Sequence, residues 1–162
     1  MDWDKELDGT YLQEWEGWKT RMMELNLTTF PRWVKGEGKS YEDGTSLHVF
    51  SDASEKGYGA VAYIRTELEE GRFRSRLLMS KARVAPLKTV TIPRLELSAA
   101  VLAVRISRGV AKEFRRSFKK IYFWTDSVIV LRYISNKTSR FPTFVANRVQ
   151  EILENTTAVQ WN

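Results

Sequence analysis

Three acidic residues stand where a sheet and a helix would bring them to one edge. Asp52 ends the apolar run 47–51, and Asp126 ends a second apolar run, 121–125. Glu96 follows Pro93, which suits the first turn of a helix because its missing N–H is not needed there. In an α/β sheet, the carboxyl ends of parallel strands lie where the next helices begin. The pattern therefore predicts that Asp52, Glu96 and Asp126 lie close together.

Three carboxylates in one place repel one another, and a divalent cation is the usual means of relieving that repulsion. The chain has no cysteine, and His48 is its single histidine, which excludes thiolate zinc sites and a His-rich cluster. Oxygen ligands alone favour Mg²⁺ or Mn²⁺. Taken singly, Asp52 could belong to a turn, Asp126-Ser127 to a helix cap, and Glu96 to a helix first turn. Their joint occurrence favours a metal site.

The hydrophobic periodicity predicts one α/β domain after residue 45, with a mixed sheet. Short connections make the first three strands antiparallel neighbours, and the run 121–125, apolar on both faces, is typical of a central parallel strand. We expect strands at 47–51, 58–65, 73–81, 121–125 and 157–161, and helices at 93–114, 128–135 and around 144–153.

The first 45 residues differ from the rest in composition. Residues 35–44 are Gly-rich and charged, as in a linker. Before them, apolar residues recur at three- and four-residue steps, which predicts an amphipathic helix from about residue 10 and a packing surface for a partner outside this chain. These residues are Trp3, Leu7, Tyr11, Trp15, Trp18, Met22 and Leu25. We therefore divide the chain into a helical segment with its linker, 1–45, and a domain, 46–162.

The net charge of +6 is compatible with a polyanionic partner, because each phosphate neutralised by Lys or Arg releases counterions. The basic residues cluster in 72–76, 81–83 and 112–120, although solvated strand and helix ends would look the same. There is no run of about 18 apolar residues and no charged-then-apolar amino terminus. We therefore expect no membrane span and an intracellular, cytoplasmic location.

Four stretches of the sequence, in this order, carry a resemblance to a known family: VFSDASEKGYGAVAYIR, IPRLELSAAVLAVRI, FWTDSVIVLRYI and RFPTFVANRVQEI. They resemble the ribonuclease H domain of BEL/Pao-type LTR retrotransposon polyproteins, over about residues 46 to 162. The Trp-rich start is similar to the connecting segment that follows the reverse transcriptase in those polyproteins. The resemblance implies a ribonuclease H-like fold, with an RNA–DNA hybrid and the reverse transcriptase portion of the same polyprotein as partners.

The resemblance also implies an activity, hydrolysis of the RNA strand of a hybrid by two Mg²⁺ (or Mn²⁺) ions. Asp52 would be the first catalytic carboxylate and would bridge both ions, while Glu96 and Asp126 would hold the ion at the leaving group. Three neighbours of these carboxylates are candidates for contacting the sugar–phosphate backbone or the 2′-OH of RNA: Ser54, Arg94 and Ser127.

The family carries a fourth aspartate, in an Asn-Pro-Ala-Asp-like motif followed by a last helix, and this sequence ends at Asn162, before that motif. We therefore expect weak or no cleavage by this exact chain. Glu151 and Glu154 are expected on a helix surface rather than as substitutes. The alternative is a degenerate, non-catalytic domain that binds nucleic acid or packs against a reverse transcriptase.

Two other classes of protein fit the sequence less well. A retroviral-type integrase would carry its carboxylates in the order Asp, Asp, Glu, whereas here the order is Asp, Glu, Asp. An aspartic protease would need Ser or Thr and then Gly after its aspartate, whereas Asp52 is followed by Ala53-Ser54.

Overall fold

A computed structural model of the chain describes residues 4, 6, 8–29, 45–68, 71–114, 118–136, 138 and 140–162. It divides into two compact units, Met1–Gly36 and Glu37–Asn162. The predicted linker at 35–44 lies outside the described residues. The domain boundary proposed from the sequence, between residues 45 and 46, therefore stays a prediction.

The first unit contains helix α1, Gly9–Glu24, followed by a 3₁₀ turn, Leu25–Leu27. The helix lies where the apolar periodicity predicts it, and its N-cap position is Asp8. None of its residues is buried, and Trp15 and Trp18 stack on its surface with ring centroids 5.0 Å apart. Trp3 and Leu7 lie outside the described residues. The apolar stripe of α1 is thus exposed within its own unit, and its role as a packing surface stays a prediction.

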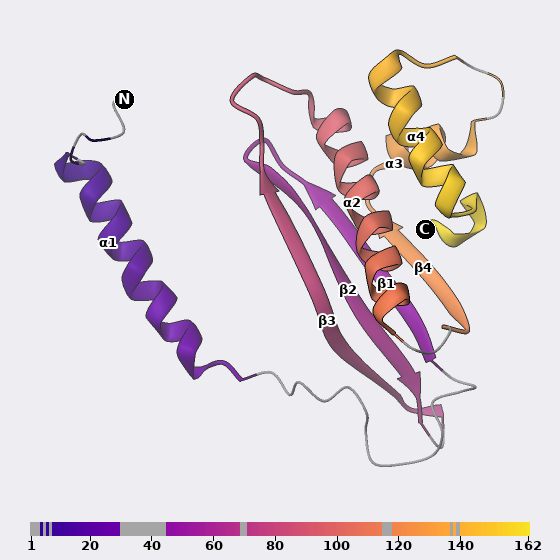
Figure 1. The fold of residues 1–162 in the computed structure, drawn as a ribbon, viewed down its shortest axis with the longest axis horizontal. Coiled ribbons are helices and arrows are strands. Elements are labelled where there is room, and N and C mark those ends of the chain that lie inside the picture. The colour runs from indigo at the N-terminus through magenta and orange to yellow at the C-terminus, as the bar shows by residue number, and fades with distance from the viewer. Residues whose placement is uncertain are drawn as a thin grey trace. The chain divides into compact units, whose positions relative to one another are not determined.

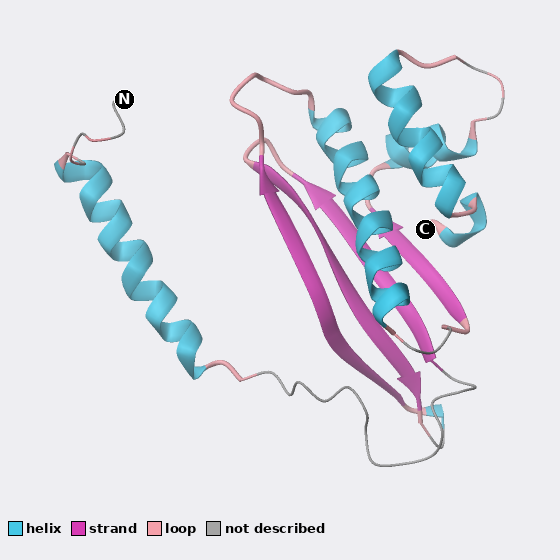
Figure 2. Cartoon of the chain, in the orientation of Figure 1, coloured by secondary structure: helices cyan, strands magenta, loops and turns pink. Residues whose placement is uncertain are grey.

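The second unit is built on a four-stranded mixed sheet in the order β3-β2-β1-β4 (Figure 1). The strands are β1, Thr45–Ala53; β2, Gly57–Glu67; β3, Phe73–Val84; and β4, Lys120–Thr125. β2 runs antiparallel to both β1 and β3, whereas β4 runs parallel to β1. Together with the helices shown in Figure 2, this arrangement confirms the predicted α/β class and the predicted mixed sheet.

In the described part of this unit, three α-helices accompany the sheet: α2, Ile92–Glu113; α3, Val128–Ser135; and α4, Thr143–Asn155. α2 has Pro93 in its first turn, as predicted, and packs across β1 and β2 (Figure 1). The core forms between α2 and one face of the sheet, because alternate strand residues such as Leu47, Val49 and Phe123 point to that side. α4 packs in turn on α2. None of the helices in the described ranges is long and apolar enough to cross a membrane.

The opposite face of the sheet carries a ladder of aromatic rings. Phe50 stacks on Trp124 at 5.8 Å and meets Tyr63 edge to face at 6.1 Å, and His48 stacks on Tyr122 at 4.9 Å. Phe50 retains 42% of its accessible surface, so this face is only partly covered by the residues that the structure describes.

Two predicted features at the carboxyl-terminal end are wrong. Residues 158–160 form a 3₁₀ turn instead of the predicted strand, because the side chains of Thr157 and Gln160 form a capping box. Of the predicted strand, only Trp161 makes a bridge to β4, at Phe123. The run 121–125 was expected in the centre of the sheet, yet β4 stands at one end of the strand order, with only Phe123 fully buried.

Candidate active site

Asp52 and Asp126 leave neighbouring strands at the same end of the sheet. Ser51 of β1 is paired with Thr125 of β4 in the parallel register, so the residues that follow them come out side by side. Both aspartates are exposed, and both line an open cavity of about 1130 Å³, which Phe50 and Trp124 also line. The structure therefore brings together two of the three predicted carboxylates.

Hydrogen bonds between nearby residues stabilise the turn next to Asp52. Asp52 Oδ1 accepts a hydrogen bond from the Ala53 N–H at 2.7 Å, and Ser54 and Gly57 exchange backbone bonds of 2.8 and 3.3 Å. A Cβ at Gly57 would lie 2.7 Å from the Arg83 carbonyl oxygen, so the close approach of β2 and β3 at this point requires glycine.

Glu96 lies in the second turn of α2. The sequence suggested the first turn, but α2 begins at Ile92 and its first turn contains no acidic residue. The Glu96 Oε2 atom accepts a hydrogen bond from Ser127 Oγ at 2.5 Å, and Ser127 directly follows Asp126 in the chain. Glu96 thus contacts the residue next to Asp126, while it is not among the residues that line the cavity.

The fit to a metal ion is partial in this arrangement. The donors are all carboxylate oxygens, which suits a hard cation such as Mg²⁺ or Mn²⁺. Within the described ranges, however, no three Asp, Glu, His or Cys side chains converge closely enough to hold one ion. Asp52 and Asp126 share a cavity and Glu96 is bonded to Ser127, so the predicted common coordination shell is not assembled. The catalytic and metal-binding roles of the three carboxylates stay predictions.

The three predicted nucleic-acid contacts occupy different environments. Ser54 is exposed and lines the cavity beside Asp52. Arg94 places its guanidinium 5.2 Å from the centre of the Phe144 ring on α4, away from the cavity lining. Ser127 is only 6% exposed and caps α3 by accepting a hydrogen bond from the Val130 N–H at 3.2 Å. Their roles in binding stay predictions.

Basic side chains also line the cavity. Lys81 and Arg83 come from β3, as the predicted basic clusters suggested, and Lys56 comes from the turn between β1 and β2. Sequence reasoning missed Lys56, because a lone lysine in a turn carries no pattern. The Lys56 carbonyl oxygen accepts from the Ala85 N–H at 2.9 Å, which ties this turn to the end of β3. Positive charge therefore lies in the same cavity as the two aspartates.

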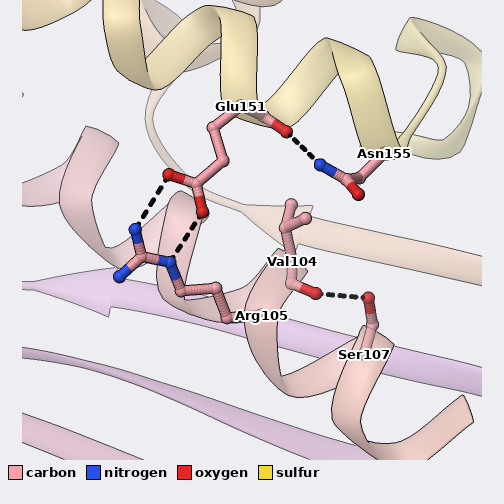
Figure 3. Close-up of polar contacts among 5 residues, drawn as sticks. All are labelled: Val104, Arg105, Ser107, Glu151 and Asn155. Atoms are coloured by element: carbon pink, nitrogen blue, oxygen red, sulfur yellow. Dashed lines mark hydrogen bonds and ion pairs between the residues drawn. The ribbon is translucent and has the colours of Figure 1, made fainter. Parts of the chain in front are cut away.

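Glu151 and Glu154 both lie on α4, away from the cavity. Arg105 of α2 donates to both carboxylate oxygens of Glu151, from Nε at 2.6 Å and from Nη2 at 2.8 Å (Figure 3). Glu154 accepts from the Gln150 side-chain amide at 2.7 Å. As expected from the sequence, these two residues belong to the surface of a helix.

Residues 1–127 match the model of the family described as Pao retrotransposon-like RNaseH-like domain. This range includes α1, all four strands and α2, together with Asp52, Glu96, Asp126 and Ser127. No curated protein sequence matches the chain.

Solved structures with similarity to the chain include three of low sequence identity. RNase H1 from the halophilic archaeon Halobacterium salinarum NRC-1 is 15% identical, with a TM-score of 0.44 over 72% of this chain and 81% of that one. LC11-RNase H1, in complex with an RNA/DNA hybrid, is 12% identical, with a TM-score of 0.40 over 72% and 80%. The protease–reverse transcriptase of prototype foamy virus is 14% identical, with a TM-score of 0.39 over 78% and 17%.

Proposed function

Because the chain belongs to the Pao retrotransposon-like RNaseH-like domain family, we propose that it is a metal-dependent nuclease domain that hydrolyses the RNA strand of RNA–DNA hybrids. The observation that carries this proposal is the placement of Asp52 and Asp126 at adjacent ends of parallel strands, over one cavity lined with basic side chains. Such strand ends are where α/β proteins commonly bind their ligands.

Each side chain has a distinct part in this proposal. Asp52 and Asp126 would bind metal from the sheet, and Glu96 would complete the ligand set from α2. Two Mg²⁺ or Mn²⁺ ions, when bound, would lower the pKa of the attacking water and stabilise the leaving 3′ oxygen. Lys56, together with Lys81 and Arg83 in the same cavity, would hold phosphates of the hybrid.

The exposed stripe of α1 supports a second part of the proposal, the reverse transcriptase portion of the same polyprotein as a partner. Tyr11, Trp15 and Trp18 each keep close to half of their accessible surface. A contiguous set of large apolar side chains on a solvent-exposed helix is typical of a protein–protein contact.

The test of the proposed activity is cleavage of a labelled RNA strand within a hybrid, in the presence of Mg²⁺ and separately of Mn²⁺. In keeping with the weak cleavage expected from the sequence, wild-type chain should cut the hybrid slowly and leave double-stranded DNA intact. Asp52→Asn should abolish this cutting while hybrid binding persists, because the basic surface is unchanged. Glu154→Gln, an exposed carboxylate change on α4, is the matched control. Cutting by Asp52→Asn at the wild-type rate would contradict the assignment.

A second candidate function is nucleic-acid binding without catalysis. The observation in its favour is that no three metal-ligating side chains converge in the described part of the chain. Wild-type chain that binds hybrid tightly, yet shows no more cutting than Asp52→Asn with either ion, would favour this function.

A further inference from the structure

The Ser127 hydroxyl takes part in two hydrogen bonds that connect α3 with α2. It accepts from the Val130 N–H at 3.2 Å, which caps α3, and it lies 2.5 Å from Glu96 Oε2 on α2. A hydroxyl has one hydrogen and two lone pairs. Since the backbone N–H of Val130 uses a lone pair, the single hydrogen is free to point at Glu96, and both bonds form at once.

The position of Ser127 is itself fixed by its surroundings. Its backbone N–H donates to Thr125 Oγ1 at 3.2 Å, at the end of β4, and the Leu131 N–H donates to its carbonyl oxygen at 3.1 Å, in the first turn of α3. With 6% of its surface exposed, Ser127 has little room to move and little surface to offer to a substrate. The hydroxyl is therefore a fixed donor.

Glu96 depends on such a donor for its orientation. Its neighbours Leu95 and Leu97 are buried, which sets the α2 backbone, but a glutamate side chain has several rotatable bonds beyond that backbone. A hydrogen bond to Oε2 selects one orientation and leaves Oε1 with all of its lone pairs for a further ligand. Outer hydrogen bonds of this kind orient metal-binding carboxylates, and their loss commonly weakens metal affinity by about 10- to 100-fold.

We propose that Ser127 is a positioning residue for Glu96: its hydroxyl, fixed by the N-cap of α3, holds the α2 carboxylate beside the end of β4, from which Asp126 emerges. The inference rests on the proposed function, in which Glu96 is a metal ligand. It gives Ser127 a role different from the sugar–phosphate contact suggested by the sequence, because the hydroxyl hydrogen is already committed to Glu96.

The first experiment is a calorimetric titration of Mn²⁺ into the full chain and its variants. Ser127→Ala should weaken Mn²⁺ binding by about tenfold, whereas Ser127→Thr, which keeps a hydroxyl and remains a good N-cap, should restore most of the affinity. Ile152→Val is the matched control, because it removes one methyl from a fully buried site on α4 and lowers stability without touching Glu96. Equal affinity in wild type and Ser127→Ala, or equal weakening in Ile152→Val, would overturn the positioning role.

The second experiment is a double-mutant cycle on thermal unfolding, which needs no metal. Ser127→Ala, Glu96→Ala and the double variant should show shifts in melting temperature that do not add, because both single changes remove the same bond. Additive shifts would overturn the inference. Wild-type chain that binds no Mn²⁺ would refute the proposed function and the positioning role with it, whereas binding that Ser127→Ala leaves unchanged would refute the role of Ser127 alone.

Discussion

Arg105 in the middle of α2 and Glu151 on α4 form a bidentate ion pair, in which the guanidinium Nε and Nη2 each donate a hydrogen bond to one carboxylate oxygen (Figure 3). The bond from Arg105 is the main reason that the pKa of Glu151 lies below its ordinary value. The pair joins the two helices that pack on each other above the sheet. Glu151 is thus a structural residue, and its charge serves the contact between α2 and α4.

Glu151→Gln should lower stability by about 0.2–1 kcal/mol, because the pair is partly exposed and screened by solvent. A depressed carboxylate pKa contributes stability that is present above the unfolded value and is lost as the pH falls through the folded value. The difference between wild type and Glu151→Gln should therefore shrink at acidic pH and also in about 1 M salt. Thermal unfolding measures this difference in stability, with Glu154→Gln as the control on the same helix. An undiminished difference in high salt would show that packing, not charge, accounts for the effect.

Burial, and secondarily the charge of Arg65, lower the pKa of His48, whose Nδ1 accepts from the Trp124 indole N–H at 3.2 Å. The unfolded chain, in which the histidine pKa is near 6.5, therefore takes up this proton at a higher pH than the folded chain does. Stability should therefore be full above about pH 6.5 and decrease as the pH falls below it. Melting temperatures between pH 5.5 and 7.5 check this, with His48→Gln expected to flatten the profile. A profile equally steep in that variant would assign the titration to another group.

Lys81 and Arg83 should contribute to hybrid binding in a salt-dependent manner. If each contacts one phosphate, replacing either with Ala should reduce the slope of log affinity against log salt by about 0.9. Lys19→Ala is a suitable control, because Lys19 pairs with Glu16 on α1 at 2.6 Å. Binding measured by fluorescence anisotropy over a salt series would reveal the slopes. Unchanged slopes in both β3 variants would indicate a solvated strand instead of a phosphate-binding surface.

Gly57→Ala should destabilise the second unit by about 1–3 kcal/mol, since the new methyl would meet the Arg83 carbonyl oxygen and force the strands apart. Gly109→Ala is the matched control within the same unit. It lies inside α2 with no atom within 4 Å of the added Cβ, and the change should stabilise that helix by up to about 1 kcal/mol. Chemical denaturation distinguishes the two, and equal stability of both variants would contradict the close approach at Gly57.

Most of the fold can be predicted from the sequence, because hydrophobic periodicity indicates which side of a helix or strand is buried. The helix at 128–135 coincides with its prediction, and the parallel pairing of β1 and β4 follows from the crossover through α2. The failures depend on hydrogen bonds of individual side chains, which periodicity does not report. The bond between Glu96 and Ser127 requires the crossing of α2 over the end of β4, and the capping box at Thr157 competes locally with strand formation.

The candidate site likewise contains residues whose positions the sequence predicts and residues whose positions it does not. Asp52 and Asp126 could be placed together from the sequence, because the carboxyl ends of neighbouring parallel strands meet at one edge and both residues directly follow paired strand residues. The orientation of Glu96 could not, since it depends on a side-chain hydrogen bond made across two helices. Lys56 enters the cavity only because its turn folds back toward the end of β3.

β3 is the outermost strand of the sheet, and it is 12 residues long. A strand of this length at a sheet margin presents backbone donors and acceptors that could recruit another copy of the chain into a growing fibre. Arg74, Lys81 and Arg83 stand along it in exposed positions, so two such margins brought together would carry like charges into contact. Lys81 and Arg83, which we assign to phosphate binding, would thereby also protect the domain from self-association.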